Sequence, residues 1–149
     1  MAVGFDHRGV HLRQTVLEVL LDEGVDLVDL GVETDATRVD YPDVARDVGM
    51  AIRSGQAERG ILVCGSGVGA SIAASKIPGI RAAICHDPYS AAQGVEHDDM
   101  NVLCLGSEVI GPSLAAELVR RFLGAEFIGE GRYVERLVKV EELEKLVDG

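Results

Sequence analysis

The segment GILVCGSGVGAS, residues 60–71, ends an apolar run with Cys64 and then places glycines at alternate positions. A cysteine thiolate can act as a base or a nucleophile, and glycines between a strand and a helix let backbone N–H groups point at one spot. A helix N-terminus adds partial positive charge there, so such a loop can hold a phosphate or an oxyanion that forms during a reaction. The loop lacks a P-loop lysine, and the spacing of Gly65, Gly67 and Gly69 differs from a dinucleotide fingerprint. The segment therefore favours catalysis or small-anion binding over a conventional nucleotide site.

Other reactive side chains stand beside further apolar runs of the sequence. Loop histidines can titrate near neutral pH, but many are simply solvated, and adjacent carboxylates often cap a turn. Cys85 and Cys104 lie inside apolar runs and fit better as small core residues. The remaining candidates are Asp6 and His7 after the first run, His86 and Asp87 after the fourth, and His97, Asp98 and Asp99 before the fifth.

The C-terminal segment carries a basic stripe. Arg132 and Arg136 stand four residues apart, and Lys139 continues the same helical face. Such a stripe can be a solvated face paired with nearby glutamates. Two arginines on one face can equally grip a phosphate through several charge-assisted hydrogen bonds. The residues alone leave both interpretations open.

The composition limits the class of protein. A chain of 149 residues with 47% hydrophobic residues favours one domain, residues 1–149, with its own core. A formal net charge of −11 opposes nucleic-acid binding by phosphate neutralisation. No apolar run approaches the roughly 20 residues that span a membrane, and no signal peptide is apparent. Three cysteines at no zinc-like spacing indicate free thiols and predict a cytoplasmic protein without a metal site.

Strand-like and helix-like patterns alternate along the chain. This alternation indicates an α/β fold of parallel βαβ units with helices on both faces of the sheet, in which ligands sit beyond the carboxyl ends of the strands. The last helix has no strand after it, so we expect it to dock elsewhere or on a partner subunit. The predicted strands are 1–5, 25–31, 59–65, 80–86 and 101–106. The predicted helices are one from Leu12 that ends before Gly24, then 41–55, 68–76, 88–99, 112–124 and 131–147.

These stretches together resemble ribose-5-phosphate isomerase B and its wider sugar-phosphate isomerase family, which includes galactose-6-phosphate isomerase. The resemblance covers nearly the whole chain in the expected order. The matching pieces are DHRG at 6–9, VDYPDVA at 39–45, GILVCGSGVGASIAASKIPGIRAAICHDPYSA at 60–91, EHDDMNVLCLGSEVIGP at 96–112 and GRYVERL at 131–137.

The resemblance implies a Rossmann-like three-layer sandwich with a five-stranded parallel sheet. It also implies a homodimer, or a tetramer, in which the C-terminal helix docks on a partner subunit and active sites take residues from both subunits. The reaction would be aldose–ketose isomerisation of a sugar phosphate, without a metal or organic cofactor. Cys64 would move a proton between C2 and C1 through an enediolate, and Ser66 with His97 would assist ring opening. The residues that would bind substrate are Asp6, His7, Gly65, Gly67, Val68, Gly69, Ser71, Asp98, Arg132 and Arg136.

Three positions depart from the pattern of that family. Asp98 stands where many members have asparagine, and a carboxylate donates no hydrogen bond unless it is protonated. Glu108 stands where the family often has an arginine near the phosphate, and an acid there repels a dianion unless it is turned away or paired. Tyr133 replaces a common histidine. Because none of these removes the base or the glycine loop, isomerisation remains the leading prediction, with ribose 5-phosphate and ribulose 5-phosphate as the substrate pair.

Two alternatives remain open. One is the same chemistry on a six-carbon sugar phosphate, of the allose 6-phosphate or galactose 6-phosphate type, or on a free sugar. The other is a non-catalytic phosphate- or nucleotide-binding module built on the same kind of sheet.

Overall fold

The computed structural model describes residues 1–147 and contains one parallel sheet with the strand order β2-β1-β3-β5-β4. The predicted five-stranded parallel sheet is therefore confirmed, while residues 148 and 149 of the predicted domain lie outside the described part. The strands are β1 (Ala2–Phe5), β2 (Val28–Asp29), β3 (Gly60–Cys64), β4 (Ala82–Ile84) and β5 (Val102–Gly106). Strand β2 is shorter than the predicted 25–31. At its start, Val25 donates back to Leu20 at the end of the preceding helix instead of pairing with β1, whereas beyond its end the N–H groups of Leu30 and Val32 still donate to the carbonyls of Val3 and Phe5.

The helices connect the strands as the sequence pattern predicts, with ends that differ by a few residues. A 3₁₀ turn, η1 (Gly9–Leu12), precedes α1 (Arg13–Asp22). The largest difference is at the last helix, predicted as 131–147, which ends at Glu144. Asp87 caps α4 (Pro88–Asp98) by accepting a hydrogen bond from the N–H of Ser90 at 2.7 Å, so its role is structural. The other helices are α2 (Tyr41–Arg53), α3 (Val68–Ala74), α4 (Pro88–Asp98), α5 (Pro112–Gly124) and α6 (Gly131–Glu144), followed by the 3₁₀ turn η2 (Lys145–Val147).

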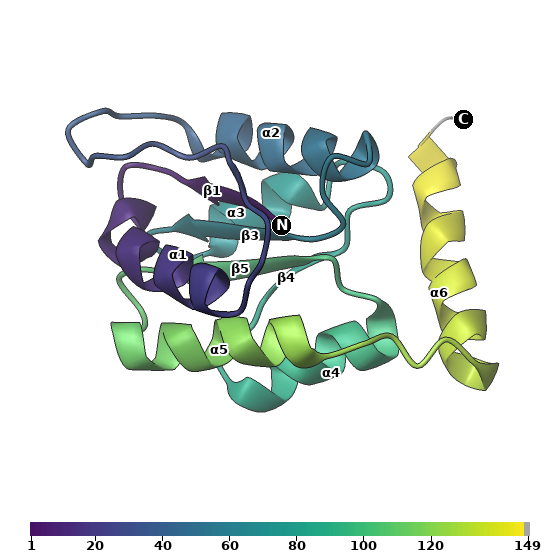
Figure 1. Ribbon diagram of the computed structural model, residues 1–149. Helices are drawn as coiled ribbons and strands as arrows, with labels where there is room; N and C mark the ends of the chain where they lie inside the picture. The colour runs from purple at the N-terminus through teal and green to yellow at the C-terminus, as the bar shows by residue number, and fades with distance from the viewer. Residues whose placement is uncertain (148–149) are drawn as a thin grey trace.

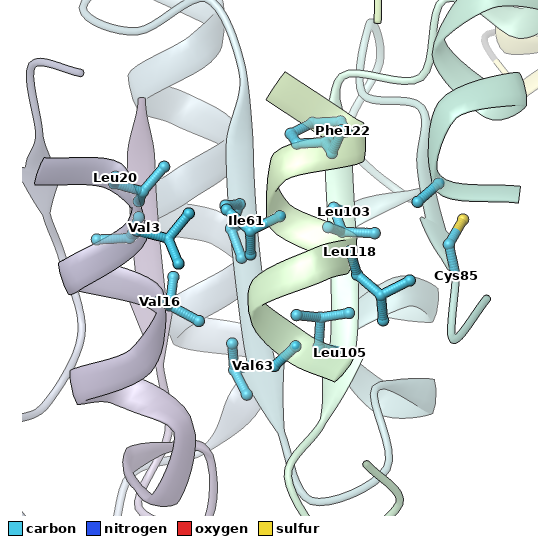
Figure 2. Close-up of a cluster of buried hydrophobic side chains, with 14 of the residues drawn as sticks. Val3, Val16, Leu20, Ile61, Val63, Cys85, Leu103, Leu105, Leu118 and Phe122 are labelled. Carbon is cyan, nitrogen blue, oxygen red and sulfur yellow. The ribbon is translucent and has the colours of Figure 1, made fainter. Parts of the chain in front are cut away.

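The sheet lies between two layers of helices, and a hydrophobic core fills the space on each of its faces (Figure 1). Successive strand residues point to opposite faces, so Ile61 and Val63 pack against α1 and α5, whereas Leu62 and Cys64 face α2 and α3. Figure 2 shows the first core, where Val16 and Leu20 from α1 and Leu118 and Phe122 from α5 cover the central strands. These buried faces fix β3 and β5 side by side, and with them the loops that follow both strands.

Helix α6 stands apart from the three layers (Figure 1). It has no buried residue, and it exposes Val134, Val138 and Leu143 to solvent. Its described contacts include α4, near the start of α6. An amphipathic helix with no buried residue of its own agrees with the expectation that it docks elsewhere. Within residues 1–147, no helix combines the length and the apolar content needed to cross a bilayer.

Candidate active site

The loops that follow β1, β3 and β5 meet at the carboxyl edge of the sheet and are tied together by hydrogen bonds. The N–H groups of Ser107 and Glu108 donate to the carbonyls of Cys64 and Gly65, at 2.9 and 3.0 Å. The hydroxyl of Ser107 donates to the carbonyl of Arg8 at 2.8 Å. The parallel register that pairs Cys64 with Gly106 therefore builds one platform from three distant parts of the chain.

Cys64 ends β3 at the centre of this platform. Its side chain is 5% exposed, and its Sγ accepts a hydrogen bond from the N–H of Gly67 at 3.1 Å. Gly67 has a φ of +81°, and a Cβ at this position would lie 3.2 Å from the carbonyl carbon of Leu105. Only glycine adopts this backbone without strain, so Gly67 is what turns the amide toward the sulfur. The structure thus brings Cys64 and the glycine loop together as predicted.

The remaining amides of the loop divide into used and unused donors. The N–H of Val68 donates to Oγ of Ser66 at 3.2 Å, and the N–H of Ser71 donates to the carbonyl of Gly67. Among residues 1–147, the N–H groups of Gly69 and Ala70 have no acceptor, as expected for the first turn of a helix. Two donors available to an oxyanion are therefore the N–H of Gly69, which was among the predicted residues, and the N–H of Ala70, which was not.

Tyr41, at the start of α2, forms a wall of the site that sequence reasoning missed. A Cβ on Gly69 would lie 2.8 Å from two atoms of the Tyr41 ring, so the ring covers the loop directly. The side chain is 43% exposed and borders the open side of the platform. Its place in the stretch VDYPDVA, at a helix start, was the available signal.

Asp6 and His7 follow β1 at the same edge. The Oδ1 atom of Asp6 accepts hydrogen bonds from the N–H groups of Arg8 and Gly9, at 3.0 and 2.7 Å, so this buried carboxylate shapes the loop. The Nδ1 atom of His7 lies 3.2 Å from the carbonyl of Val39, which leaves Nε2 facing away from that bond. Both residues therefore lie at the predicted site, and the Asp6 carboxylate binds the backbone of the loop that follows it.

His86 also reaches this edge, from the end of β4. Its Nε2 accepts a hydrogen bond from the N–H of Gly106 at 2.9 Å, which requires the unprotonated nitrogen. Burial lowers the pKa of the His86 imidazole, consistent with a neutral ring. Gly106 packs tightly against Ser66, because a Cβ there would lie 2.6 Å from the Ser66 carbonyl. His86 therefore supports the loop that carries Ser66.

The other two cysteines belong to the core, as predicted. Cys104 is fully buried and Cys85 is 4% exposed. Burial raises the pKa of the Cys85 thiol to about 11 and also raises that of Cys104. Both thiols are therefore protonated at neutral pH.

His97 and its neighbours form a second group at the opposite edge of the sheet. Helix α4 runs antiparallel to the strands, so its last turn lies near the amino end of β5, whereas Cys64 pairs with Gly106 at the carboxyl end. The length of β5 alone separates these ends by about 13 Å. The structure therefore does not bring His97 together with Cys64 within one chain.

This second group is organised around the start of α6. The His97 and Tyr133 rings lie 4.9 Å apart, and the Arg136 guanidinium lies 5.1 Å from the centre of the Tyr133 ring. Nδ1 of His97 lies 2.8 Å from the amide nitrogen of Gln93. Asp98 and Arg132 are exposed nearby. His97 and the predicted phosphate residues Arg132 and Arg136 thus lie far from the predicted base, whereas Ser66, the other predicted ring-opening residue, stays beside it.

Asp99 has a structural role in the turn that follows α4. It adopts a left-handed conformation with a φ of +50°, and its carboxylate accepts a hydrogen bond from Arg81 at 2.9 Å. Of the adjacent pair, Asp98 is thus the exposed carboxylate.

The largest cavity described in the chain, about 840 Å³, is not lined by Cys64. It lies between the edge strand β4, helix α4 and the end of α6, with Ile84, Gln93 and Leu143 among its lining residues. The largest cavity and the reactive cysteine therefore lie in different places, and the candidate active site is the one that contains Cys64. Among residues 1–147, no three His, Cys, Asp or Glu side chains are grouped so that they could hold a metal ion.

Comparisons with known proteins agree on one family. A family model described as Ribose/Galactose Isomerase matches residues 1–140. The chain is 42% identical over 145 residues to ribose-5-phosphate isomerase B of Escherichia coli, covering 97% of this chain and 96% of that protein. It is 40% identical over 147 residues to D-erythrulose-4-phosphate isomerase of Pectobacterium atrosepticum, covering 97% of each.

A solved structure extends this agreement to the fold. Ribose-5-phosphate isomerase B of Clostridium thermocellum superposes with a TM-score of 0.93 at 43% identity, covering 98% of this chain and 97% of that one. A match of this extent in sequence and structure establishes the relationship. The chain therefore belongs to the ribose/galactose isomerase family of aldose–ketose isomerases.

Proposed function

We propose that the protein interconverts ribose 5-phosphate and ribulose 5-phosphate, with Cys64 as the proton-transferring base. The observation that carries this proposal is the position of the Cys64 sulfur, held 3.1 Å from the Gly67 amide at the carboxyl edge of the sheet. A relative at 42% identity that bears the name ribose-5-phosphate isomerase B supports the substrate.

The reaction needs a base and a means of stabilising negative charge, because a proton next to a carbonyl is only weakly acidic. The Cys64 thiolate takes the proton from C2 of the open-chain aldose, and the electrons of that C–H bond move to give the enediolate. Return of the proton to C1, with transfer of the hydroxyl proton from O2 to O1, gives the ketose. The unused N–H groups of Gly69 and Ala70 would donate to the enediolate oxygens.

A second copy of the chain would complete the site. His97, Arg132 and Arg136 lie at the amino edge, where they cannot reach Cys64 of their own chain. Helix α6 has no buried residue, and the edge strand β4 borders the 840 Å³ cavity, so both offer surface to a partner. In the homodimer that we propose, His97 of one copy assists ring opening beside Ser66 of the other. Arg132 and Arg136 of that copy, with Asp98 beside them, would face the phosphate end of the substrate.

A four-carbon substrate is the second candidate, because the relative named for D-erythrulose 4-phosphate is nearly as similar, at 40% identity. None of the relatives described above is named for a six-carbon sugar, although the description of the family model includes galactose. Membership of an isomerase family speaks against the non-catalytic binding module. The three free cysteines support a reducing compartment, and we place the protein in the cytoplasm.

The test is the rate of isomerisation by the purified protein, without added metal, on ribose 5-phosphate, D-erythrulose 4-phosphate, allose 6-phosphate and free ribose. We expect the highest kcat/KM on ribose 5-phosphate. A higher kcat/KM on D-erythrulose 4-phosphate would transfer the assignment to the four-carbon sugar. Absence of turnover on all four by folded protein would overturn the proposal.

A further inference from the structure

The side chain of Arg8 lies directly on the glycine loop. A Cβ on Gly65 would lie 2.4 Å from Cζ, 2.6 Å from Nε and 2.7 Å from Nη1 of Arg8, so the guanidinium occupies the space that any other residue would need. Gly65 directly follows Cys64, and Arg8 is half-exposed at 51%. A permanent positive charge therefore stands at the open rim of the proposed site.

Glu108 holds this guanidinium from the opposite loop, 100 residues away in sequence. Nε of Arg8 donates to Oε1 at 3.0 Å and Nη2 donates to Oε2 at 2.5 Å, a two-point pairing that fixes the plane of the group. The hydrogen bond from Arg8 also lowers the pKa of Glu108, so the carboxylate is ionised near neutral pH. Glu108 is thus paired, which meets the condition under which an acid is tolerated near a phosphate.

The pairing leaves one edge of the guanidinium free. Of its five N–H donors, two bind Glu108, and Nη1 has no hydrogen-bond acceptor among residues 1–147. The nearest other carboxylate of the loop, Asp6, is buried and accepts from backbone N–H groups. The free edge is therefore a planar pair of donors beside Gly65, on a side chain that is half-exposed, and this geometry suits phosphate oxygens.

We propose that Arg8 binds the phosphate group of the substrate through this free edge and that Glu108 is a positioning residue that aims it. The inference rests on the proposed function and adds to it a phosphate contact on the same chain as the base. An acid at position 108 is expected to repel the phosphate, but under this proposal Glu108 favours phosphate binding because its carboxylate orients the Arg8 guanidinium.

The competing explanation is that the ion pair only clamps two loops. A clamp would affect every ligand of the site alike, whereas a phosphate contact acts only on ligands that carry a phosphate. A double variant, Arg8→Ala combined with Glu108→Arg, also distinguishes the clamp from the phosphate contact. It places the guanidinium on the other loop, so it keeps a cation near the same place but has no ion pair.

The experiment compares wild type, Arg8→Ala, Glu108→Ala and the double variant Arg8→Ala/Glu108→Arg. The measurements are KM and kcat for ribose 5-phosphate, turnover of free ribose, and calorimetric Kd for inorganic phosphate. Arg46→Ala is the matched control, since Arg46 is an exposed arginine of α2 that is paired with Asp43 and Asp47.

We expect Arg8→Ala to weaken inorganic phosphate and to raise KM for ribose 5-phosphate by about tenfold or more, with kcat little changed and free ribose unaffected. We expect Glu108→Ala to raise the same KM by less, and the double variant to recover most of the lost phosphate affinity. Equal losses on free ribose and on phosphate, or no recovery in the double variant, would establish the clamp instead. A lower KM in Glu108→Ala would overturn its positioning role.

The phosphate Kd keeps this inference separate from the proposed function. If wild type turns over none of the sugars but Arg8→Ala still loses phosphate, the reaction is misassigned and the contact stands. If wild type is active and Arg8→Ala equals it in every measurement, the contact is wrong and the reaction stands.

Discussion

The Sγ atom of Cys64 accepts a hydrogen bond from the backbone N–H of Gly67, three residues later in the chain. This bond joins the end of a buried strand to a loop whose left-handed glycine aims the amide. The core packs against one side of the Cys64 side chain and the loop binds its sulfur from the other, so the sulfur is fixed in position. A proton-transferring base benefits from such fixed placement, because a small displacement from the reacting carbon is costly.

Cys64→Ala should retain the fold and lose most of the isomerase activity. A general base typically contributes about 10²–10⁴-fold to a rate, so kcat should fall within that range, with residual activity from the loop amides. The free energy of unfolding should change by only about 1 kcal/mol, since one sulfur atom is removed from the core. Turnover of ribose 5-phosphate and urea unfolding measure the two effects. Near wild-type kcat in a folded variant would show that the base is another group.

Alkylation with iodoacetamide at neutral pH should label Cys64 well before the other two cysteines. The thiolate is the reactive form. Cys64 is only 5% exposed, but it ends β3 at the edge of the sheet where the substrate would bind, and the N–H of Gly67 donates to its sulfur. The raised pKa of Cys85, about 11, and the complete burial of Cys104 keep those two thiols unreactive. Peptide mass spectrometry over time would give the order, and ribose 5-phosphate should slow labelling of Cys64. Cys64→Ala is the control and should incorporate almost no label. Equal rates at Cys64 and Cys85 would contradict the proposal that Cys64 is the reactive thiol of the site.

The sequence predicts the elements of this fold well because its periodicity reflects burial. The continuous apolar run 59–65 became the fully buried β3, and the helices with an apolar face pack on the sheet as expected. The exception is the segment 25–31, whose alternation is only partly used for pairing. A short edge strand is specified by one neighbour, so its pattern constrains its length less than that of a central strand.

The site was less predictable, because its walls come from contacts between distant loops. Arg8 and Tyr41 lie within stretches that resemble the family, yet nothing in their spacing shows that both cover the glycine loop. The position of His97 was deducible: a residue just before a strand of a parallel sheet lies at the edge opposite to residues that follow strands. The residue types and their spacing in the sequence thus identify Cys64, while only the folded structure identifies the residues that surround it.

Mixed dimers should recover activity from two inactive variants. If Cys64 and His97 act on the same substrate from different copies, a Cys64→Ala/His97→Asn heterodimer has one intact site and one doubly altered site. Joint refolding of equal amounts should then restore roughly a quarter of wild-type activity per chain. Activity before and after joint refolding, with sedimentation to verify the dimer, makes the measurement.

The matched control for this mixture pairs Cys64→Ala with Ser66→Ala, which alter the same half of the site and should not complement. Cys64→Ala mixed with Arg132→Ala should complement. A dimer that shows no recovery in the Cys64–His97 mixture would rule out sharing of the site between copies.

Acidification should destabilise the protein partly through His86. Its pKa is lowered by burial, so below the unfolded value of about 6.5 the unfolded chain binds a proton that the folded chain does not. Stability therefore rises with pH through the window between the lowered pKa and about 6.5, and it is lost as the pH falls through that window. His86→Phe, which cannot titrate, should show a flatter dependence of unfolding free energy on pH between about 5 and 7.

His86→Phe should also be less stable than wild type above that range, because the Gly106 N–H loses its acceptor. Urea unfolding at several pH values tests this, with His11→Asn as the control, since the side chain of His11 is 62% exposed. Parallel curves for wild type and His86→Phe would show that folding does not lower the pKa of His86, which would contradict this prediction.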